Sequence, residues 1–195
     1  MKFNITKKSG NARIGKLNLK HGIIDTPSFM TVGTYGSVKS LTNNELLDCN
    51  VQIILCNAYH LMLRPDQKII EKAGGLHKFM NWNKPILTDS GGYQVFSLSS
   101  QTKVSRDGVE FKSPLNGSKV FLSPEKSIEI QINLGSDIMM IFDECTPYPA
   151  NKEQAKKSME LSLYWAELSH KANTSSMPLF GICLLYTSPS PRDVL

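Results

Sequence analysis

Long hydrophobic runs are missing from this sequence. Although 41% of the 195 residues are hydrophobic, the longest apolar clusters are "VQIIL" and "IMMIF", which have the length of a strand. A helix that crosses a membrane needs roughly 20 consecutive apolar residues. The N-terminal stretch "MKFNITKKSGN" also lacks the apolar segment of a secretory signal peptide. We therefore expect a cytoplasmic protein with one sizeable core and no membrane partner.

Cysteine motifs that bind metal ions are missing as well. Cys49, Cys56, Cys145 and Cys183 form no CxxC pair and have no histidine at zinc-finger spacing. Basic residues form no dense cluster, because the net charge of +5 comes from scattered lysines and arginines. We expect no metal site within this chain. The charge by itself permits a nucleic-acid partner without requiring one.

Apolar stretches of strand length are what the sequence does contain, and stretches with helix signals separate them. No glycine-rich phosphate-binding fingerprint follows the first of these strands. The expected strands, in chain order, are "PSFMTV", "VQIILCNAYH", "PILTD", "DIMMIFDE" and "PLFGI".

Helix starts are marked by capping residues. Thr42 and Glu45 have the spacing of a capping box, and two glycines end the helix expected in "DQKIIEKAGG". Ser123, which precedes a proline, begins another helix. A long helix is expected from about Asn151. Its apolar stripe is expected to consist of Met159, Leu163 and Ala166.

This alternation predicts an α/β fold with a parallel sheet covered by helices. A doubly wound sheet and a (β/α)8 TIM barrel both fit, and polar residues at the strand ends favour the barrel. Only about five of the eight strands are present, so we expect an incomplete barrel. Period-two alternation in "KFNITKK" and "ARIGKLNL" predicts an N-terminal β lead-in. Two turn signals, Asp107-Gly108 and Asn116-Gly117, predict an inserted β-hairpin region.

The C-terminal segment breaks the pattern. After Ile182, "CLLYTSPSPRD" changes abruptly to serine and proline and resembles the in-frame translation of a transposase adapter used to prepare sequencing libraries. A genuine disordered tail is the alternative. We expect residues 1–182 to be the N-terminal part of a single barrel domain, interpret residues 183–195 as a non-native tail, and build no argument on Cys183.

Two carboxylates follow apolar strands at the ends where barrel enzymes hold their sites. Asp89 follows "PILT" and Asp143 follows "IMMIF". A serine and two glycines after Asp89 allow a tight turn with room for a flat ligand. Tyr93 would then stack on a planar base, or else pack in the core beneath the loop. The sequence predicts a binding site here, with a solvated loop aspartate or a helix N-cap as the alternative for each carboxylate.

Four motifs together resemble the tRNA-guanine transglycosylase family, also called queuine tRNA-ribosyltransferase. They are "TPSFMTVGTYGSVK", "ILCNAYHLMLRPD", "LTDSGGYQVFSLS" and "FDECTPYP". The resemblance extends to Ile182. It implies a zinc-containing barrel that replaces guanine at the wobble position of tRNAs for Tyr, His, Asn and Asp with a deazaguanine.

The resemblance also assigns roles to the carboxylates. Asp89 matches a proton-handling residue that helps bind the base, and Asp143 matches the residue that recognises it. One carboxylate can accept both the N1-H and the 2-amino group of guanine, a donor pair that adenine does not present. Tyr93 matches the stacking tyrosine, and Asn57 matches a residue that pairs with the active-site aspartate in the empty enzyme. Other pocket residues implied by the resemblance are Ser90, Gly91, Gly92 and Gln94.

Cys145 matches a position that is cysteine in bacterial members, whose base is 7-aminomethyl-7-deazaguanine, and valine in eukaryotic ones. His60 in "CNAYH" is expected to be an orienting or core residue rather than a catalytic one. The family's nucleophile is an aspartate later in the barrel, and its zinc is held by three cysteines and a histidine later still. We therefore expect this chain alone to be inactive, to bind no zinc, and to belong to a parent that acts as a homodimer on the tRNA anticodon loop.

Two alternatives stay open at this point. One is a non-catalytic homologous subunit that binds tRNA, although such a subunit has no need to keep the base pocket. The other is a barrel glycoside hydrolase that uses Asp89 and Asp143 as its two carboxylates.

Overall fold

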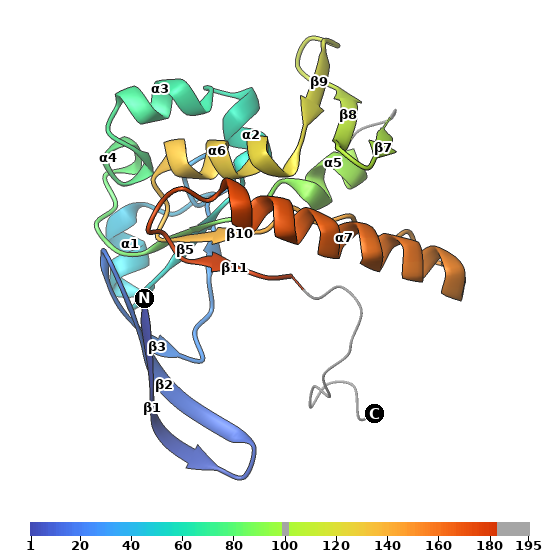
Figure 1. The fold of residues 1–195 in the computed structure, drawn as a ribbon. Coiled ribbons are helices and arrows are strands. Elements are labelled where there is room, and N and C mark those ends of the chain that lie inside the picture. The colour runs from blue at the N-terminus through green and yellow to red at the C-terminus, as the bar shows by residue number, and fades with distance from the viewer. Residues whose placement is uncertain (99–101, 183–195) are drawn as a thin grey trace.

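A computed structural model describes residues 1–98 and 102–182 (Figure 1). Its centre is a five-stranded sheet in the order β11-β10-β6-β5-β4, in which every neighbouring pair is parallel. The strands are β4 (Thr31–Val32), β5 (Ile54–Cys56), β6 (Ile86–Thr88), β10 (Ile138–Met140) and β11 (Leu179–Phe180). The predicted parallel sheet and all of its expected strands are therefore confirmed.

Two antiparallel sheets flank the parallel one, at the bottom and the top of Figure 1. The lead-in sheet contains β1 (Lys2–Ser9), β2 (Ala12–Leu19) and β3 (Gly22–Thr26). The inserted sheet contains β7 (Lys103–Ser105), β8 (Gly108–Lys112) and β9 (Lys119–Leu122). Both expected β regions are confirmed, and the lead-in has a third strand, β3, that was not predicted.

Helices connect the strands of the parallel sheet. They are α1 (Asn43–Asp48), α2 (Ala58–Leu63), α3 (Gln67–Lys72), α4 (Leu76–Met80), α5 (Gly92–Leu98), α6 (Pro124–Leu134) and α7 (Lys152–Ala172). Thr42 and Asn151 form capping boxes, and the Ser123 side chain accepts a hydrogen bond from the backbone N–H of Lys126. Within residues 1–98 and 102–182, no helix combines the length and apolar character needed to cross a membrane.

The expected strand "VQIILCNAYH" is too long. Its last residues cap and begin α2, and α4 and α5 form where no helix was expected. Strand pairing ends because the backbone N–H of Ala58 donates to the Asp89 carboxylate instead of to a neighbouring strand. A short apolar run fits a buried strand and a buried helix equally well, so periodicity could not locate this boundary.

The apolar stripe predicted for α7 is wrong. Met159 and Leu163 are 38% and 60% exposed, whereas Ser158, Trp165 and Ser169 are buried. The serines face inward because they bond the chain that continues β10: the Ser169 hydroxyl accepts from the backbone N–H of Phe142. Hydrophobicity alone cannot reveal a helix face that is buried through polar contacts.

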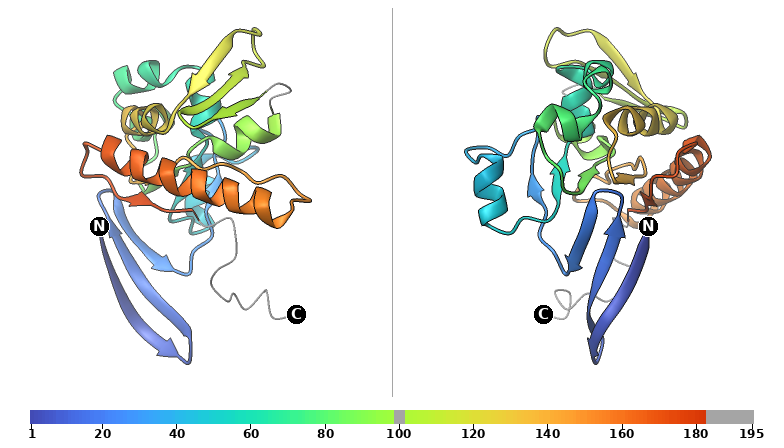
Figure 2. Two further views of the ribbon diagram at one scale, coloured as in Figure 1. Left: turned by 45° about the vertical axis from the view of Figure 1, so that its right-hand side comes forward. Right: turned by 90° about the vertical axis from the view of Figure 1, so that its left-hand side faces the viewer.

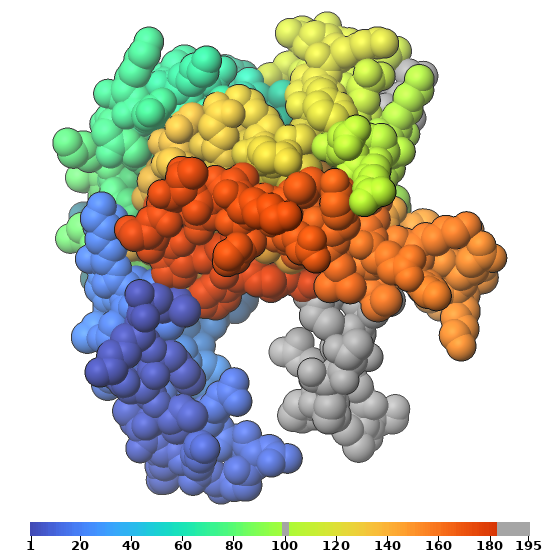
Figure 3. Space-filling model, in the orientation of Figure 1, coloured from blue at the N-terminus to red at the C-terminus, as the bar shows by residue number. Residues whose placement is uncertain are grey.

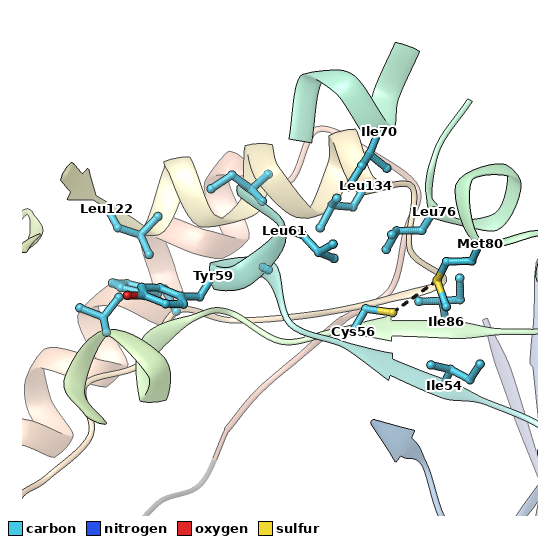
Figure 4. Packing of buried hydrophobic residues seen from close by; sticks show 14 of the residues in the cluster. Ile54, Cys56, Tyr59, Leu61, Ile70, Leu76, Met80, Ile86, Leu122 and Leu134 are labelled. Carbon is cyan, nitrogen blue, oxygen red and sulfur yellow. Dashed lines mark hydrogen bonds between the residues drawn. The ribbon is translucent and has the colours of Figure 1, made fainter. Parts of the chain in front are cut away.

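The main core lies between the parallel sheet and the helices that cover it. Figure 4 shows Ile54 and Cys56 of β5 and Ile86 of β6 packed against Leu61, Leu76 and Met80 of the helices. A smaller cluster, formed by Ile24, Ile53, Leu87 and Ile138, joins the lead-in sheet to the other face. Figures 2 and 3 show that α7 covers one side of the molecule while the far end of the lead-in sheet extends from the body.

Gln131 of α6 binds the central strands directly. Its side chain is fully buried, and its amide accepts from the backbone N–H of Met140 at 2.9 Å and donates to the carbonyl of the same residue at 2.9 Å. The Thr88 hydroxyl donates to the same amide oxygen at 3.0 Å. Gln131 therefore satisfies the backbone of β10 at the point where the parallel ladder ends.

Replacement of this residue tests its role. Gln131→Leu leaves the N–H and carbonyl of Met140 without their partner, so we expect the free energy of unfolding to fall by about 2–4 kcal/mol, since each unpaired buried group costs about 1–3 kcal/mol. Urea titration of this chain measures the change. Glu129→Leu, on the exposed face of the same helix, is the matched control and should change stability by less than about 0.5 kcal/mol. Equal effects of the two substitutions would show that Gln131 does not support β10.

Candidate active site

The register of the parallel strands places the first site residues side by side. Cys56 pairs with Thr88, so the next residues, Asn57 and Asp89, leave neighbouring strands together. The side-chain amide of Asn57 donates to Oδ2 of Asp89. Gln94 of α5 donates to the same oxygen at 3.0 Å, and the backbone N–H of Ala58 donates to Oδ1 at 2.8 Å.

Two opposing influences act on the pKa of the Asp89 carboxyl group. Burial raises the pKa of its carboxyl group, and the hydrogen bonds from Asn57, Ala58 and Gln94, together with the charge of His60, act in the opposite direction. Burial favours the protonated form and the donors favour the carboxylate. Such a group can accept or release a proton when a ligand changes its donors, which fits the predicted role in proton handling.

Asp143 lies beyond the end of β10 and is 6% exposed. The Ser90 hydroxyl donates to its Oδ1 at 3.0 Å and accepts from the backbone N–H of Gly92 at 3.2 Å. Burial raises the pKa of Asp143, as do the charges of Asp89 and Glu144, while the Ser90 hydrogen bond lowers it. Within the described residues, the donors to this carboxylate are the Ser90 hydroxyl and the backbone N–H of Asp143 itself, so part of its acceptor capacity has no protein donor.

The glycines bring the two strand ends together. A Cβ atom on Gly92 would lie 2.6 Å from the carbonyl oxygen of Asp143 and 2.8 Å from Oδ1 of the same residue, which is closer than such atoms approach. Gly91 has φ +84° and faces Tyr59. Gly92 thus allows close packing against Asp143, and the expected room for a flat ligand stays a prediction.

Tyr93 and Cys145 flank this group. Tyr93 lies in α5 and is 62% exposed, so the alternative in which it packs in the core is excluded, and its ring is accessible to a ligand. Cys145 is partly buried, and burial raises the pKa of its thiol, with further contributions from Asp143 and Glu144. It lines a small cavity that also contains Gly92 and Asp143.

His60 lies in α2, behind the carboxylates. Its ring is 4.8 Å from that of Tyr35 and 5.2 Å from that of Tyr59, measured between ring centroids. Burial lowers its pKa, and Asp89 acts in the opposite direction. The packing between two tyrosines fits the expected orienting or core role.

Some supporting residues were missed by sequence reasoning. The Ser127 hydroxyl of α6 donates to the carbonyl of Ser90 at 2.7 Å and so fixes the loop that follows β6. Ser127 and Gln131 are four residues apart, on the same face of α6 as the buried Leu134. Two polar residues at this spacing on an apolar face were the signal, because buried polar side chains are retained where they have partners.

The zinc ligands implied by the resemblance have no counterpart among the described residues. Cys49 is exposed after α1, Cys56 is buried in β5, and Cys145 follows β10. None of the three belongs to a group of potential metal ligands in the part of the chain that the structure describes. A site of cysteines and one histidine does not fit here, and we derive no step from it.

Two hydrogen-bonded groups therefore lie side by side at the carboxyl ends of β5, β6 and β10: Asn57 and Gln94 around Asp89, and Ser90 on Asp143. One carboxylate carries several donors, and the other is buried with open acceptor capacity. The pair can bind a ligand with adjacent N–H donors and can move a proton beside it.

Comparisons with known proteins agree with this geometry. A sequence model of the family described as queuine tRNA-ribosyltransferase matches residues 8–192. A queuine tRNA-ribosyltransferase from Thermoanaerobacter pseudethanolicus is 60% identical over 186 residues, which cover 93% of this chain and 50% of the relative. One from Tolumonas auensis is 58% identical over 197 residues, which cover 100% of this chain and 53% of the relative.

The chain thus spans about half the length of the curated relatives it matches. Residues 183–195, interpreted as a non-native tail, lie outside the described residues. The family match continues to residue 192. The boundary at residue 182 therefore stays a prediction. The match covers most of the chain at high identity, and the chain therefore belongs to the queuine tRNA-ribosyltransferase family.

Proposed function

We propose that this chain is the N-terminal half of a bacterial-type enzyme that exchanges the wobble guanine of tRNAs for Tyr, His, Asn and Asp for 7-aminomethyl-7-deazaguanine, a step of queuosine biosynthesis. The observation that carries the proposal is the buried carboxylate of Asp143, which has a single side-chain donor among the described residues and lies beside the Asp89 group. Guanine and its deaza analogues present N1-H and an amino group on one edge, and this carboxylate accepts both. The cysteine of "FDEC", Cys145, supports the bacterial type.

The sheet order supports a (β/α)8 barrel. The parallel strands run β4, β5, β6, β10, β11 without the reversal of order that marks a doubly wound sheet. Three further strands would close the barrel, because eight are required. On this proposal, residues 1–182 contribute the first five, and residues 183–195 are not native. Sequencing the locus from an independent library tests that boundary.

On this proposal, each described site residue has its own role in base binding or proton transfer. Asp143 accepts the base edge, Ser90 orients Asp143, and Tyr93 stacks on the base face. Asp89, released from Asn57 when a ligand binds, handles the proton, and Gln94 remains a donor to the Asp89 carboxylate.

Base exchange at one sugar with retained configuration requires two displacements through a covalent ribosyl-enzyme intermediate. The nucleophilic aspartate and the zinc ligands belong to the part of the parent beyond this chain, and the complete parent acts as a homodimer. Zinc, where bound there, would support the structure of that half. On this proposal the parent modifies the anticodon loop of tRNA in the cytoplasm. Its affinity for tRNA should fall as the salt concentration rises, because basic side chains contact the phosphates.

Two alternative functions, a glycoside hydrolase and a non-catalytic tRNA-binding subunit, are less well supported. Family membership sets aside the glycoside hydrolase. The non-catalytic tRNA-binding subunit would not need a satisfied Asp89 group beside an open Asp143, and both are retained.

The Asp143→Asn variant of the complete parent tests base recognition. An amide offers a donor where the carboxylate offers only acceptors, so one of the two base hydrogen bonds is lost. We expect guanine exchange, measured as kcat/KM, to fall about ten- to a hundredfold, since hydrogen bonds to charged groups contribute about 1.5–3 kcal/mol. Affinity for tRNA should change little. Asp48→Asn, on the exposed end of α1, is the matched control, and unchanged exchange in Asp143→Asn would remove Asp143 from its role.

The same variant should not lose stability. Because burial raises the pKa of Asp143, the native state binds this proton more tightly than the unfolded state does. The contribution of this group to stability is therefore present at low pH and lost as pH rises through its folded pKa. Asparagine removes that loss, so we expect the free energy of unfolding of this chain at pH 7 to be unchanged or higher. A fall of more than about 1 kcal/mol would indicate a structural role instead.

The isolated chain should be inactive, because no residue in it is assigned as nucleophile. We expect no incorporation when the purified chain is incubated with tRNA and radiolabelled guanine, while the complete parent incorporates the label under the same conditions. Clear incorporation by the 195-residue chain would contradict this expectation.

A further inference from the structure

A second polar cluster lies at the opposite ends of the strands from Asp89 and Asp143. Its centre is Asp137, which directly precedes β10 and whose side chain is fully buried. The backbone N–H of Ile86, at the start of β6, donates to Oδ2 of Asp137 at 2.9 Å. The backbone N–H of His21 donates to Oδ1 at 3.1 Å. The carboxylate is thus fixed by the amino ends of the central strands.

Two histidines converge on this carboxylate from distant segments. His21, in the turn between β2 and β3, has its Nδ1 atom 2.8 Å from Oδ1 of Asp137. His77, in α4, has its Nε2 atom 3.1 Å from Oδ2. The lead-in sheet, a helix and the parallel sheet therefore each contribute one side chain to the cluster.

The contact of His77 is incomplete. Its Nε2 atom is buried and lies 3.1 Å from Oδ2 of Asp137, but this contact does not meet the geometry of a directed hydrogen bond, and no other partner is found within the described part of the chain. The ring instead stacks on that of His21, with centroids 3.6 Å apart and an interplanar angle of 26°. A buried ring nitrogen without a directed partner is costly unless something else occupies that direction.

The composition of the cluster matches a metal site. Two imidazole nitrogens and one carboxylate oxygen lie within 4.8 Å of one another. Two histidines and a carboxylate, with water as the fourth ligand, are an established zinc-binding set. The backbone N–H groups of Ile86 and His21 already orient the carboxylate as outer-shell donors do around metal ligands.

We propose that His21, His77 and Asp137 bind a divalent metal ion of the zinc class, which fastens the lead-in sheet to the amino ends of β6 and β10. The ion gives Nε2 of His77 the partner that it lacks. Binding requires the two stacked rings to turn so that both nitrogen lone pairs point at one position beside Asp137. This site is separate from the proposed base pocket and from the cysteine-based zinc site of the parent's other half.

Metal titration of this chain tests the proposal. After removal of metal with a chelator, we expect one equivalent of Zn²⁺ to bind and to raise the melting temperature. His21→Gln and His77→Gln should each abolish this equivalent and the rise in melting temperature. His170→Gln, which changes an exposed histidine of α7, is the matched control and should bind as the unmodified chain does. All four proteins should carry Cys49→Ser, because an exposed thiol binds zinc nonspecifically.

Co²⁺ provides a second measurement that does not depend on the variants folding. The bound ion should give the visible spectrum of a four-coordinate site with nitrogen and oxygen ligands, without a thiolate charge-transfer band. Absence of Zn²⁺ binding would overturn the proposal and leave the cluster as a hydrogen-bonded contact, as would undiminished binding in His21→Gln and in His77→Gln. A thiolate band would do the same. If His77→Gln does not fold, the proposal is tested by His21→Gln, whose residue lies in a surface turn, and by the Co²⁺ spectrum.

Discussion

The register of the parallel strands is the constraint on which the rest of the structure depends. Cys56 pairs with Thr88 and Thr88 pairs with Met139, so β5, β6 and β10 end in step. Because carboxyl ends of parallel strands meet at one edge, this register brings Asn57 next to Asp89. A slip of one residue would turn the apolar side chains of each strand to the wrong face and separate the two carboxylates from their donors.

Polar contacts behind the sheet hold that register in place. Gln131 satisfies the backbone of Met140, Ser127 holds the carbonyl of Ser90, and Ser169 accepts from Phe142. Buried polar networks of this kind stabilise a fold only when every member has a partner, and they then favour a single arrangement. At the front, Gly92 allows the loop after β6 to touch Asp143. The position of the proposed base-recognition residue therefore depends on side chains that would never contact the base.

Buried carboxylates lie at both ends of the parallel sheet. At the carboxyl ends, burial raises the pKa of both Asp89 and Asp143, and the donors around Asp89 oppose that effect. Such opposed influences are typical of sites that exchange protons. At the amino ends, the donors around Asp137 lower its pKa, against the effect of burial, and this carboxylate joins three separate segments. Asp137 thus contacts three segments that are distant in the chain, whereas the donors to Asp89 come from the ends of β5 and β6 and from α5.

The sequence by itself determined the alternation of strands and helices, the capping residues Thr42, Ser123 and Asn151, and the presence of Asp89 and Asp143 at strand ends. These features depend on local spacing, which a sequence displays directly. Only the tertiary structure decided where β5 gives way to α2, which face of α7 is buried, and what occupies the space beside Gly92. It also brought together His21, His77 and Asp137, because contacts between residues far apart in the chain depend on packing and leave no local pattern to read.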